Sequence, residues 1–151
     1  MTAFATLDFT REIRATPERL FRLMSTAEGR AAWSAPDDTT EIRVIASDIR
    51  PGGVERAVCI PMDGPEIGVV TTFHVIDAPA RIVCTETLEM DEPLSVALVT
   101  QDIATIANGV RLTVTIQMAD VSGEMEAGYR EGWTAGLDKL ARIAEAEGVP
   151  A

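Results

Sequence analysis

Alternation of hydrophobic and polar positions dominates two parts of the chain, residues 6–14 and 41–118. The clearest case is "VRLTVTIQM" at 110–118, in which every second residue is apolar and the residues between are polar. This period is typical of a strand with one buried and one wet face. Turn sequences such as "PGG" and "NG" divide the longer part into strands. The expected strands after residue 53 are 54–61, 66–76, 81–90, 94–106 and 110–118. No helical spacing separates them, so we predict an antiparallel sheet.

Helical spacing replaces the alternation in two other places. After the first strand, Thr16 is predicted to cap a short helix beginning at Pro17, and Ser25 with Glu28 forms a capping box for a second short helix. A long helix follows the last strand and is predicted to begin near Ser122. Its apolar stripe consists of Tyr129, Trp133, Leu137, Leu140 and Ala144.

Three glycines lie along one flank of this long helix, at Gly128, Gly132 and Gly136. A glycine inside a helix costs about 0.5–1 kcal/mol relative to alanine. Three explanations are open: the close approach of another element, a dimer contact, or a space left between the helix and the sheet.

Composition and charge narrow the class of protein. The chain has 151 residues, of which 46% are hydrophobic and 25% charged, so we expect a single globular domain over residues 1–151. A formal net charge of −11 argues against nucleic acid and anionic membranes as partners. No basic N-terminal leader and no run of about 20 apolar residues is found, and we therefore expect a cytoplasmic location.

Motifs for chemistry are nearly absent. The single histidine, His74, has no cluster of further ligands at metal-binding spacing, so no metal site is predicted. Cys59 and Cys84 both lie in apolar strands, which favours two buried thiols over a disulfide. The sequence has neither a phosphate-binding glycine loop nor a Gly-x-Ser-x-Gly motif, and we expect no cofactor.

The order of these elements resembles the START-like superfamily, also called SRPBCC. More narrowly, the chain resembles the family named after the C-terminal domain of the activator of the ninety-kilodalton heat-shock protein ATPase. The matching stretches are "REIRATPERLFRLMST" at 11–26, "AAWSAP" at 31–36, "DIRPGGVERAV" at 48–58, "VIDAPARIVCTETL" at 75–88, "NGVRLTVTI" at 108–116 and "GWTAGLDKLARI" at 132–143.

This resemblance implies an α+β helix-grip fold: a curved antiparallel seven-strand sheet around the long C-terminal helix, with two short helices after the first strand. It also implies a cavity between sheet and helix, where a bare glycine flank would leave space for a guest. We therefore predict a small hydrophobic or amphipathic ligand. The candidate ligand-binding residues are Trp33, Glu55, Ala57, Cys59, Phe73, Cys84, Glu86, Tyr129, Gly132, Trp133 and Gly136.

Two acidic residues depart from the family's pattern. The resemblance implies inward positions, usually large and apolar, where this chain has Glu55, Ala57 and Cys59, and a frequent tryptophan where it has Glu86. The strand period agrees for Glu86, which interrupts an apolar face, but for Glu55 it favours the opposite face. At a strand end or beside a bulge, Glu86 would instead face solvent.

Several functions remain open at this point. Besides ligand binding, the resemblance allows a cavity enzyme, with Glu86 as acid or base beside Glu55 or Tyr129. The family's name implies a chaperone-associated regulatory domain, which we do not expect, because function belongs to sites rather than folds and the additional N-terminal domain of the eukaryotic activator is missing. A homodimer through a sheet edge or the glycine flank is compatible with each of these functions.

Overall fold

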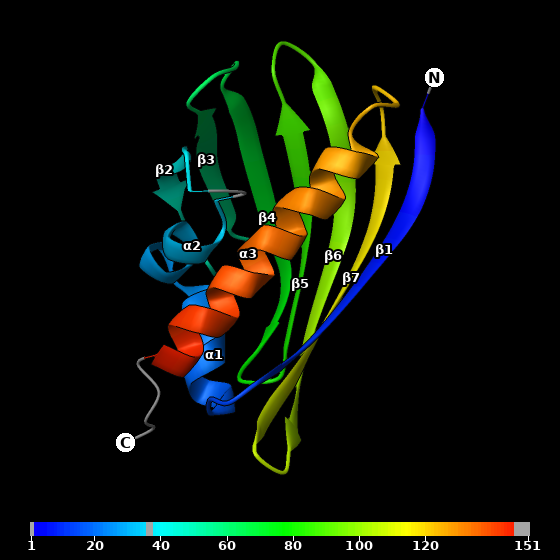
Figure 1. Cartoon of the computed structure of the whole chain (residues 1–151). Coiled ribbons are helices and arrows are strands. Elements are labelled where there is room, and N and C mark those ends of the chain that lie inside the picture. Colours follow the sequence, from blue (N-terminus) through cyan, green and yellow to red (C-terminus); the bar gives the residue numbers. More distant parts are fainter. Residues whose placement is uncertain (1, 36–37, 147–151) are drawn as a thin grey trace.

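The computed structural model describes residues 2–35 and 38–146, and these form one curved sheet with three helices on one side (Figure 1). The predicted helix-grip architecture is confirmed. The elements are β1 (Ala3–Ile13), α1 (Pro17–Ser25), α2 (Ala27–Trp33), β2 (Thr40–Ser47), β3 (Val54–Pro61), β4 (Ile67–Asp77), β5 (Arg81–Glu89), β6 (Pro93–Ile106), β7 (Gly109–Asp120) and α3 (Glu126–Ala146).

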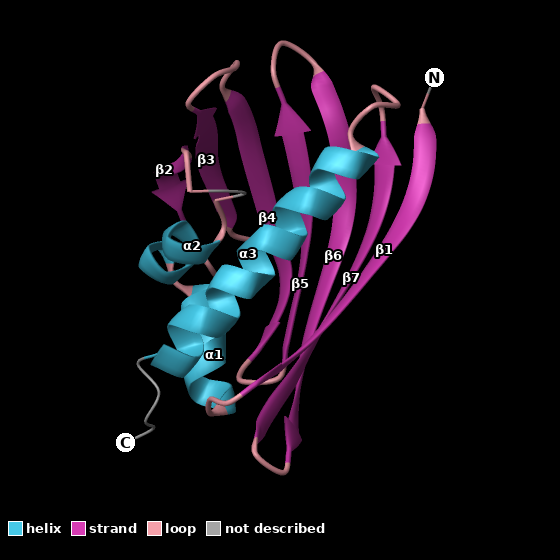
Figure 2. Cartoon of the chain, viewed as in Figure 1, coloured by secondary structure: helices cyan, strands magenta, loops and turns pink. Residues whose placement is uncertain are grey.

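The sheet has the strand order β1-β7-β6-β5-β4-β3-β2, and all neighbouring strands pair antiparallel. Only the step from β1 to β2 crosses from one edge to the other, and α1 and α2 make that crossing. The long helix α3 lies diagonally across the sheet, and the two short helices lie beside its C-terminal half (Figure 2). The space under the N-terminal half of α3 is therefore bounded mainly by strands.

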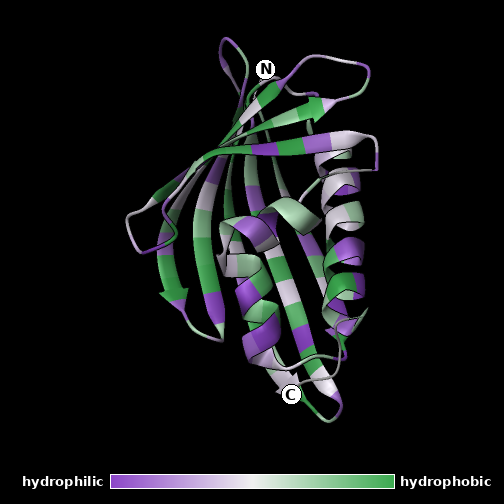
Figure 3. Ribbon diagram, turned by 90° about the vertical axis from the view of Figure 1, so that its left-hand side faces the viewer, coloured by the Kyte–Doolittle hydropathy of each residue, from purple (hydrophilic) through white to green (hydrophobic). Residues whose placement is uncertain are grey.

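The alternating pattern produces the core, and the strands carry alternating bands of hydrophobic and hydrophilic residues (Figure 3). In β7 the predicted apolar face is buried throughout, whereas Arg111 and Gln117 on the other face are exposed. The buried β7 residues are Val110, Leu112, Val114, Ile116 and Met118. They pack in one cluster with Leu137, Leu140 and Ala144 of α3, which belong to the predicted helix stripe.

The start of α2 differs from the prediction by one residue. Thr26, not Ser25, caps this helix: its backbone is extended and its hydroxyl accepts a hydrogen bond from the Gly29 amide at 3.1 Å. Ser25 is still helical, and its hydroxyl donates to the Phe21 carbonyl at 2.7 Å. The predicted capping box with Glu28 is thus wrong, because α1 continues through the serine. Thr16 caps α1 as predicted, accepting from the Arg19 amide at 3.2 Å.

The start of α3 was also predicted too early. The helix begins at Glu126, because the cap comes from the end of β7: one Asp120 carboxylate oxygen accepts from the amides of Met125 and Glu126 at 2.8 and 3.0 Å. The other oxygen accepts from the Ser122 hydroxyl and the Gly123 amide. Burial tends to raise the pKa of Asp120, but these hydrogen bonds outweigh it and lower the pKa below its ordinary value.

A tight turn before β3 sets which residues of this strand face the helices. Gly52 has a φ of +84°, and a Cβ on Gly53 would lie 1.9 Å from the Asp48 carbonyl oxygen, so only glycine fits there. The Gly53 carbonyl accepts from the Phe73 amide at 2.9 Å, which ties the turn to β4. Because side chains alternate along a strand, this starting point directs Glu55 toward the helix side.

Candidate ligand-binding pocket

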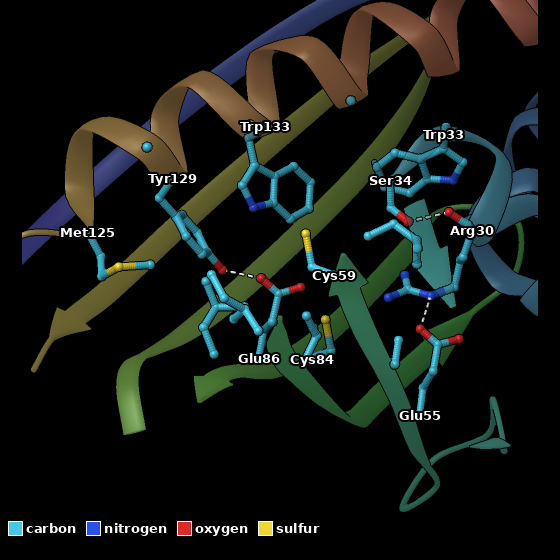
Figure 4. A pocket seen from close by; sticks show the side chains of 18 of the residues that line it. Arg30, Trp33, Ser34, Glu55, Cys59, Cys84, Glu86, Met125, Tyr129 and Trp133 are labelled. Carbon is cyan, nitrogen blue, oxygen red and sulfur yellow. Dashed lines mark hydrogen bonds and ion pairs between the residues drawn. The ribbon is translucent and has the colours of Figure 1, made fainter. Parts of the chain in front are cut away.

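A pocket of about 290 Å³ lies between the inner face of the sheet and α3, and α2 bounds one end of it (Figure 4). Its walls are mostly apolar, with a small number of polar side chains among them. The lining residues are Arg30, Trp33, Ser34, Ile42, Glu55, Ala57, Cys59, Ile67, Val69, Cys84, Glu86, Leu88, Gln101, Met125, Gly128, Tyr129, Gly132, Trp133 and Gly136.

Every candidate residue named from the sequence lines this pocket except Phe73. The Phe73 ring is fully buried, and the Arg30 guanidinium carbon lies 5.4 Å from its centroid. Phe73 is therefore a core residue covered by an arginine, a contact that strand alternation does not predict. The structure brings the other candidates together, while their role in binding stays a prediction.

The glycines of α3 serve different purposes. At Gly136 a Cβ would come within 3.2 Å of the Trp33 carbonyl oxygen, so this glycine allows α2 to pack closely on α3. At Gly128 a Cβ would meet no other atom within 4 Å, so this position borders open space. Gly132, one turn from each, lines the pocket between them. Two of the three explanations therefore apply, each at its own position.

One side of the pocket, here called the paired end, is lined by Arg30 and Glu55, and Ser47 supports Glu55 from outside the lining. The Arg30 Nε donates to Glu55 Oε1 at 2.9 Å, and the Ser47 hydroxyl donates to Glu55 Oε2 at 2.9 Å. The arginine and glutamate are only 8% and 5% exposed. Both glutamate oxygens are thus occupied, and the two buried charges compensate each other.

The opposite side, here called the carboxylate end, consists of Glu86 from β5 and Tyr129 from α3 (Figure 4). The tyrosine hydroxyl donates to Glu86 Oε1, while Oε2 has no hydrogen-bond partner among the described residues. Burial raises the pKa of Glu86, partly offset by the tyrosine hydrogen bond and the charge of Arg30. Burial and the neighbouring Glu86 charge raise the pKa of Tyr129 well above its usual value, so the phenol stays a hydrogen-bond donor.

Further polar atoms on the inner face are left unsatisfied within the described part of the chain. Thr71 pairs in register with Glu55 on β3 and with Glu86 on β5, so it lies between the two ends. Its hydroxyl oxygen is buried and makes no hydrogen bond, and the same holds for the Oε1 atom of Gln101 in the pocket wall. Since buried polar atoms are normally paired, Gln101 marks a place where a polar group of a guest would be stabilised.

Sequence reasoning missed Arg30 and Gln101. Gln101 gave a usable signal, because it interrupts the buried apolar face of β6 between Val99 and Ile103, just as Glu86 does on β5. Arg30 gave none: its helix is short, and its partner Glu55 is distant in sequence and near only in the folded chain.

The two cysteines of the pocket wall show no sign of reactive thiols. Neither cysteine forms a disulfide within the described residues, as predicted, but only Cys84 is buried and Cys59 is half-buried. Burial raises the pKa of Cys84 to about 12, which keeps its thiol protonated at neutral pH. Across residues 2–35 and 38–146 no three histidine, cysteine or acidic side chains are grouped as metal ligands. Within the same ranges no helix has the length and apolar character needed to span a membrane.

Comparison with known families shows the family of this chain. Residues 14–145 match the family model described as Activator of Hsp90 ATPase homolog 1-like protein. The chain belongs to this family. The resemblance inferred from the sequence motifs is thereby confirmed. No curated protein matches the chain.

Solved structures of the same fold are numerous. A protein from Rhizobium leguminosarum superposes with a TM-score of 0.86 at 26% identity, covering 97% of each chain. One from Rhizobium loti gives 0.81 at 27% identity, covering 93% of this chain and 97% of the other. An AHSA1-like protein from Aeromonas hydrophila, at 20% identity and a TM-score of 0.73, covers 95% and 94% of the two chains and shows the shared fold.

Proposed function

We propose that this protein binds a small hydrophobic or amphipathic molecule in the pocket between the sheet and α3. The observation that carries the proposal is the combination of mostly apolar walls with a few converging polar groups in a single concave site. Sites of this kind hold a ligand by burying its apolar surface, while the polar groups fix its orientation.

The size of the pocket limits the ligand. At about 290 Å³ it lies near the lower bound of roughly 300–1,000 Å³ that is typical of small-molecule sites. Ile42, Ile67, Val69 and Leu88 supply aliphatic wall, and both tryptophans of the chain, Trp33 and Trp133, line the space. A compact ligand with one polar head group fits this description better than a long acyl chain.

Native mass spectrometry of the freshly purified protein, compared with the denatured chain, tests the proposal. We expect a reproducible added mass of a small organic molecule that is lost on denaturation. The same spectrum counts subunits and so tests for the homodimer. A bare native mass, together with no saturable uptake of a neutral hydrophobic dye such as Nile red, would contradict the proposal.

A pocket-filling variant makes the test site-specific. Gly132→Leu adds an isobutyl group on the flank of α3 that lines the pocket, and it should abolish dye or ligand binding. Ala127→Leu adds a leucine to an exposed position of the same helix and should bind as the wild type does. Equal binding by both variants would place the ligand elsewhere.

A second candidate function, acid–base catalysis, is supported by one feature. The carboxyl group of Glu86, in the pocket wall, has a raised pKa and accepts a hydrogen bond from Tyr129. Glu55 is unsuited to assist, because Arg30 and Ser47 occupy its oxygens. Once a ligand is identified, Glu86→Gln separates the functions. Lost turnover with retained affinity favours catalysis, and lost affinity favours recognition.

A further inference from the structure

When Glu86 is ionised, the charges that line the empty pocket do not balance. Arg30 and Glu55 form a buried pair, and Ser47 satisfies the remaining glutamate oxygen. Glu86 is the carboxylate left over, since its described hydrogen-bond partner is the neutral hydroxyl of Tyr129. Glu86 is half-buried in the pocket wall, and an ionised carboxylate in such a place is costly without a cation. A cationic guest would reduce that cost.

The free oxygen of this carboxylate is available to a guest. Oε1 of Glu86 is occupied by Tyr129, while Oε2 accepts no hydrogen bond within the described residues, and the side chain belongs to the pocket lining. Gln101 presents a second acceptor in the wall, the unpartnered Oε1. The residue is 1% exposed, so bulk water does not reach it readily. Glu86 Oε2 and Gln101 Oε1 could therefore each accept a hydrogen bond from a donor group of a guest.

Two aromatic side chains of α3 lie near the Glu86 carboxylate (Figure 4). Tyr129 and Trp133 lie one turn apart on α3, with the Glu86 carboxylate between them and the sheet (Figure 4). Trp33 packs against Trp133 with ring centroids 6.0 Å apart. Aromatic rings attract cations through their π systems and offer no such attraction to anions. Carboxylate and rings therefore favour the same sign of charge.

Resting on the function proposed above, we propose that the ligand is a lipophilic amine, whose ammonium group pairs with Glu86 beside Tyr129 and Trp133 and whose apolar body fills the remaining pocket. The ammonium donates to Glu86 Oε2, and the hydrocarbon part contacts the aliphatic wall formed by Ile67, Val69 and Leu88. An anionic head group beside Tyr129 would meet the ionised Glu86 carboxylate, whereas Arg30 lies at the paired end, where its Nε pairs with Glu55.

Three probes of the same length and different head groups test this assignment: octylamine, 1-octanol and octanoate, each titrated calorimetrically at neutral pH. The charge-assisted hydrogen bond and the aromatic contacts predict that octylamine binds about tenfold to a hundredfold more tightly than 1-octanol. Octanoate should bind more weakly than the alcohol. In Glu86→Gln, which keeps the shape of the side chain, the preference for the amine should disappear.

The matched control is Glu131→Gln, on the exposed face of the same helix, which removes one negative charge outside the pocket. It should retain the wild-type preference, and loss of the preference there would assign it to the protein's overall charge and overturn the proposal. If Glu86→Gln fails to fold, the order of affinities of the three probes for the wild type still tests the amine assignment.

The outcomes separate the two proposals. Equal binding of all three probes, or tightest binding of octanoate, overturns the amine assignment and leaves the small-molecule function standing. Failure of all three probes to bind overturns the amine assignment, and a bare native mass with no dye uptake then overturns the pocket function as well.

Discussion

The two ends of the pocket each hold one carboxylate, and the protein satisfies these two groups to very different degrees. At the paired end, Glu55 has a cation on one oxygen and a hydroxyl on the other, and both charged residues are nearly inaccessible to solvent. At the carboxylate end, Glu86 has a single neutral donor and a free oxygen. Helix α3 is also packed more tightly near the paired end. Gly136 lies close to Trp33, whereas Gly128 borders open space.

The difference supports the proposed division of roles, in which the paired end maintains the fold and the carboxylate end receives the ligand. The ion pair ties α2 to β3, and each oxygen of Glu55 already accepts one hydrogen bond within the protein. An incompletely satisfied carboxyl group is costly in the empty protein, and such groups are concentrated at functional sites. The following predictions test this division, beginning with the largest expected effect.

Breaking the paired end should be the most damaging change. Arg30→Met leaves Glu55 buried without its cation and should lower the free energy of unfolding by about 3–5 kcal/mol, measured by urea denaturation. The double variant Arg30→Met/Glu55→Leu should regain most of the loss. Arg111→Met, which removes the exposed pair with Glu12, should cost less than about 1 kcal/mol. Comparable losses for Arg30→Met and Arg111→Met would refute the special role of the buried pair.

The carboxylate end depends on the cap that starts α3. Asp120→Ala should cost about 1–2 kcal/mol, because four donors lose their shared acceptor. The pKa of Asp120 is lowered in the folded state, so its contribution is complete above the ordinary pKa of about 3.9 and is lost as the pH falls through the lowered value. Wild type and variant should therefore converge in stability in strong acid, and an equal gap at every pH would contradict this.

The glycines offer a smaller, paired test. Gly128→Ala should raise stability by about 0.5–1 kcal/mol, since the methyl group meets nothing and the helix gains propensity. Gly136→Ala should gain less or lose stability, because its Cβ meets the Trp33 carbonyl oxygen at 3.2 Å. Thermal unfolding of the two variants side by side measures the difference. Equal gains would show that the helix is not closely packed at Gly136.

In acid, Glu86→Gln should change the free energy of unfolding least of all these variants. As the pH rises, the variant should become increasingly more stable than the wild type. Burial raises the pKa of Glu86, so the folded wild type holds this proton more tightly and loses stability as the pH rises from about 4.3 through the raised value. The glutamine variant lacks this loss. The groups that set the shift are Tyr129, Arg30 and Glu55, and the Cys84 thiol stays neutral.

The affinity for octylamine should follow the opposite course. It should increase over the same pH range, because the ionised Glu86 carboxylate is the form that pairs with an ammonium group. Calorimetric titrations at several pH values measure this trend, with Glu86→Gln as the reference. An affinity that does not change with pH would contradict a charge interaction at Glu86.

Much of this architecture could be predicted from periodicity and turn chemistry. The strict alternation in residues 110–118 identified a half-buried strand, and the stripe from Tyr129 to Ala144 identified the buried face of α3. These signals are local, because burial of one face repeats every second residue in a strand and about every 3.6 in a helix. The same reasoning located Glu86 on an inward face, as the structure has it.

Tertiary structure decided what local patterns leave open. The caps at Thr26 and Asp120 depend on which side chain reaches the free amides. The inward direction of Glu55 follows from the glycine turn before β3, and its charge is compensated by an arginine 25 positions away. The strands, the helices and most of their buried faces depend on neighbouring residues, and they could therefore be predicted from the sequence alone. Which carboxylate is paired and which stays open was decided by contacts between distant segments, which no local period encodes.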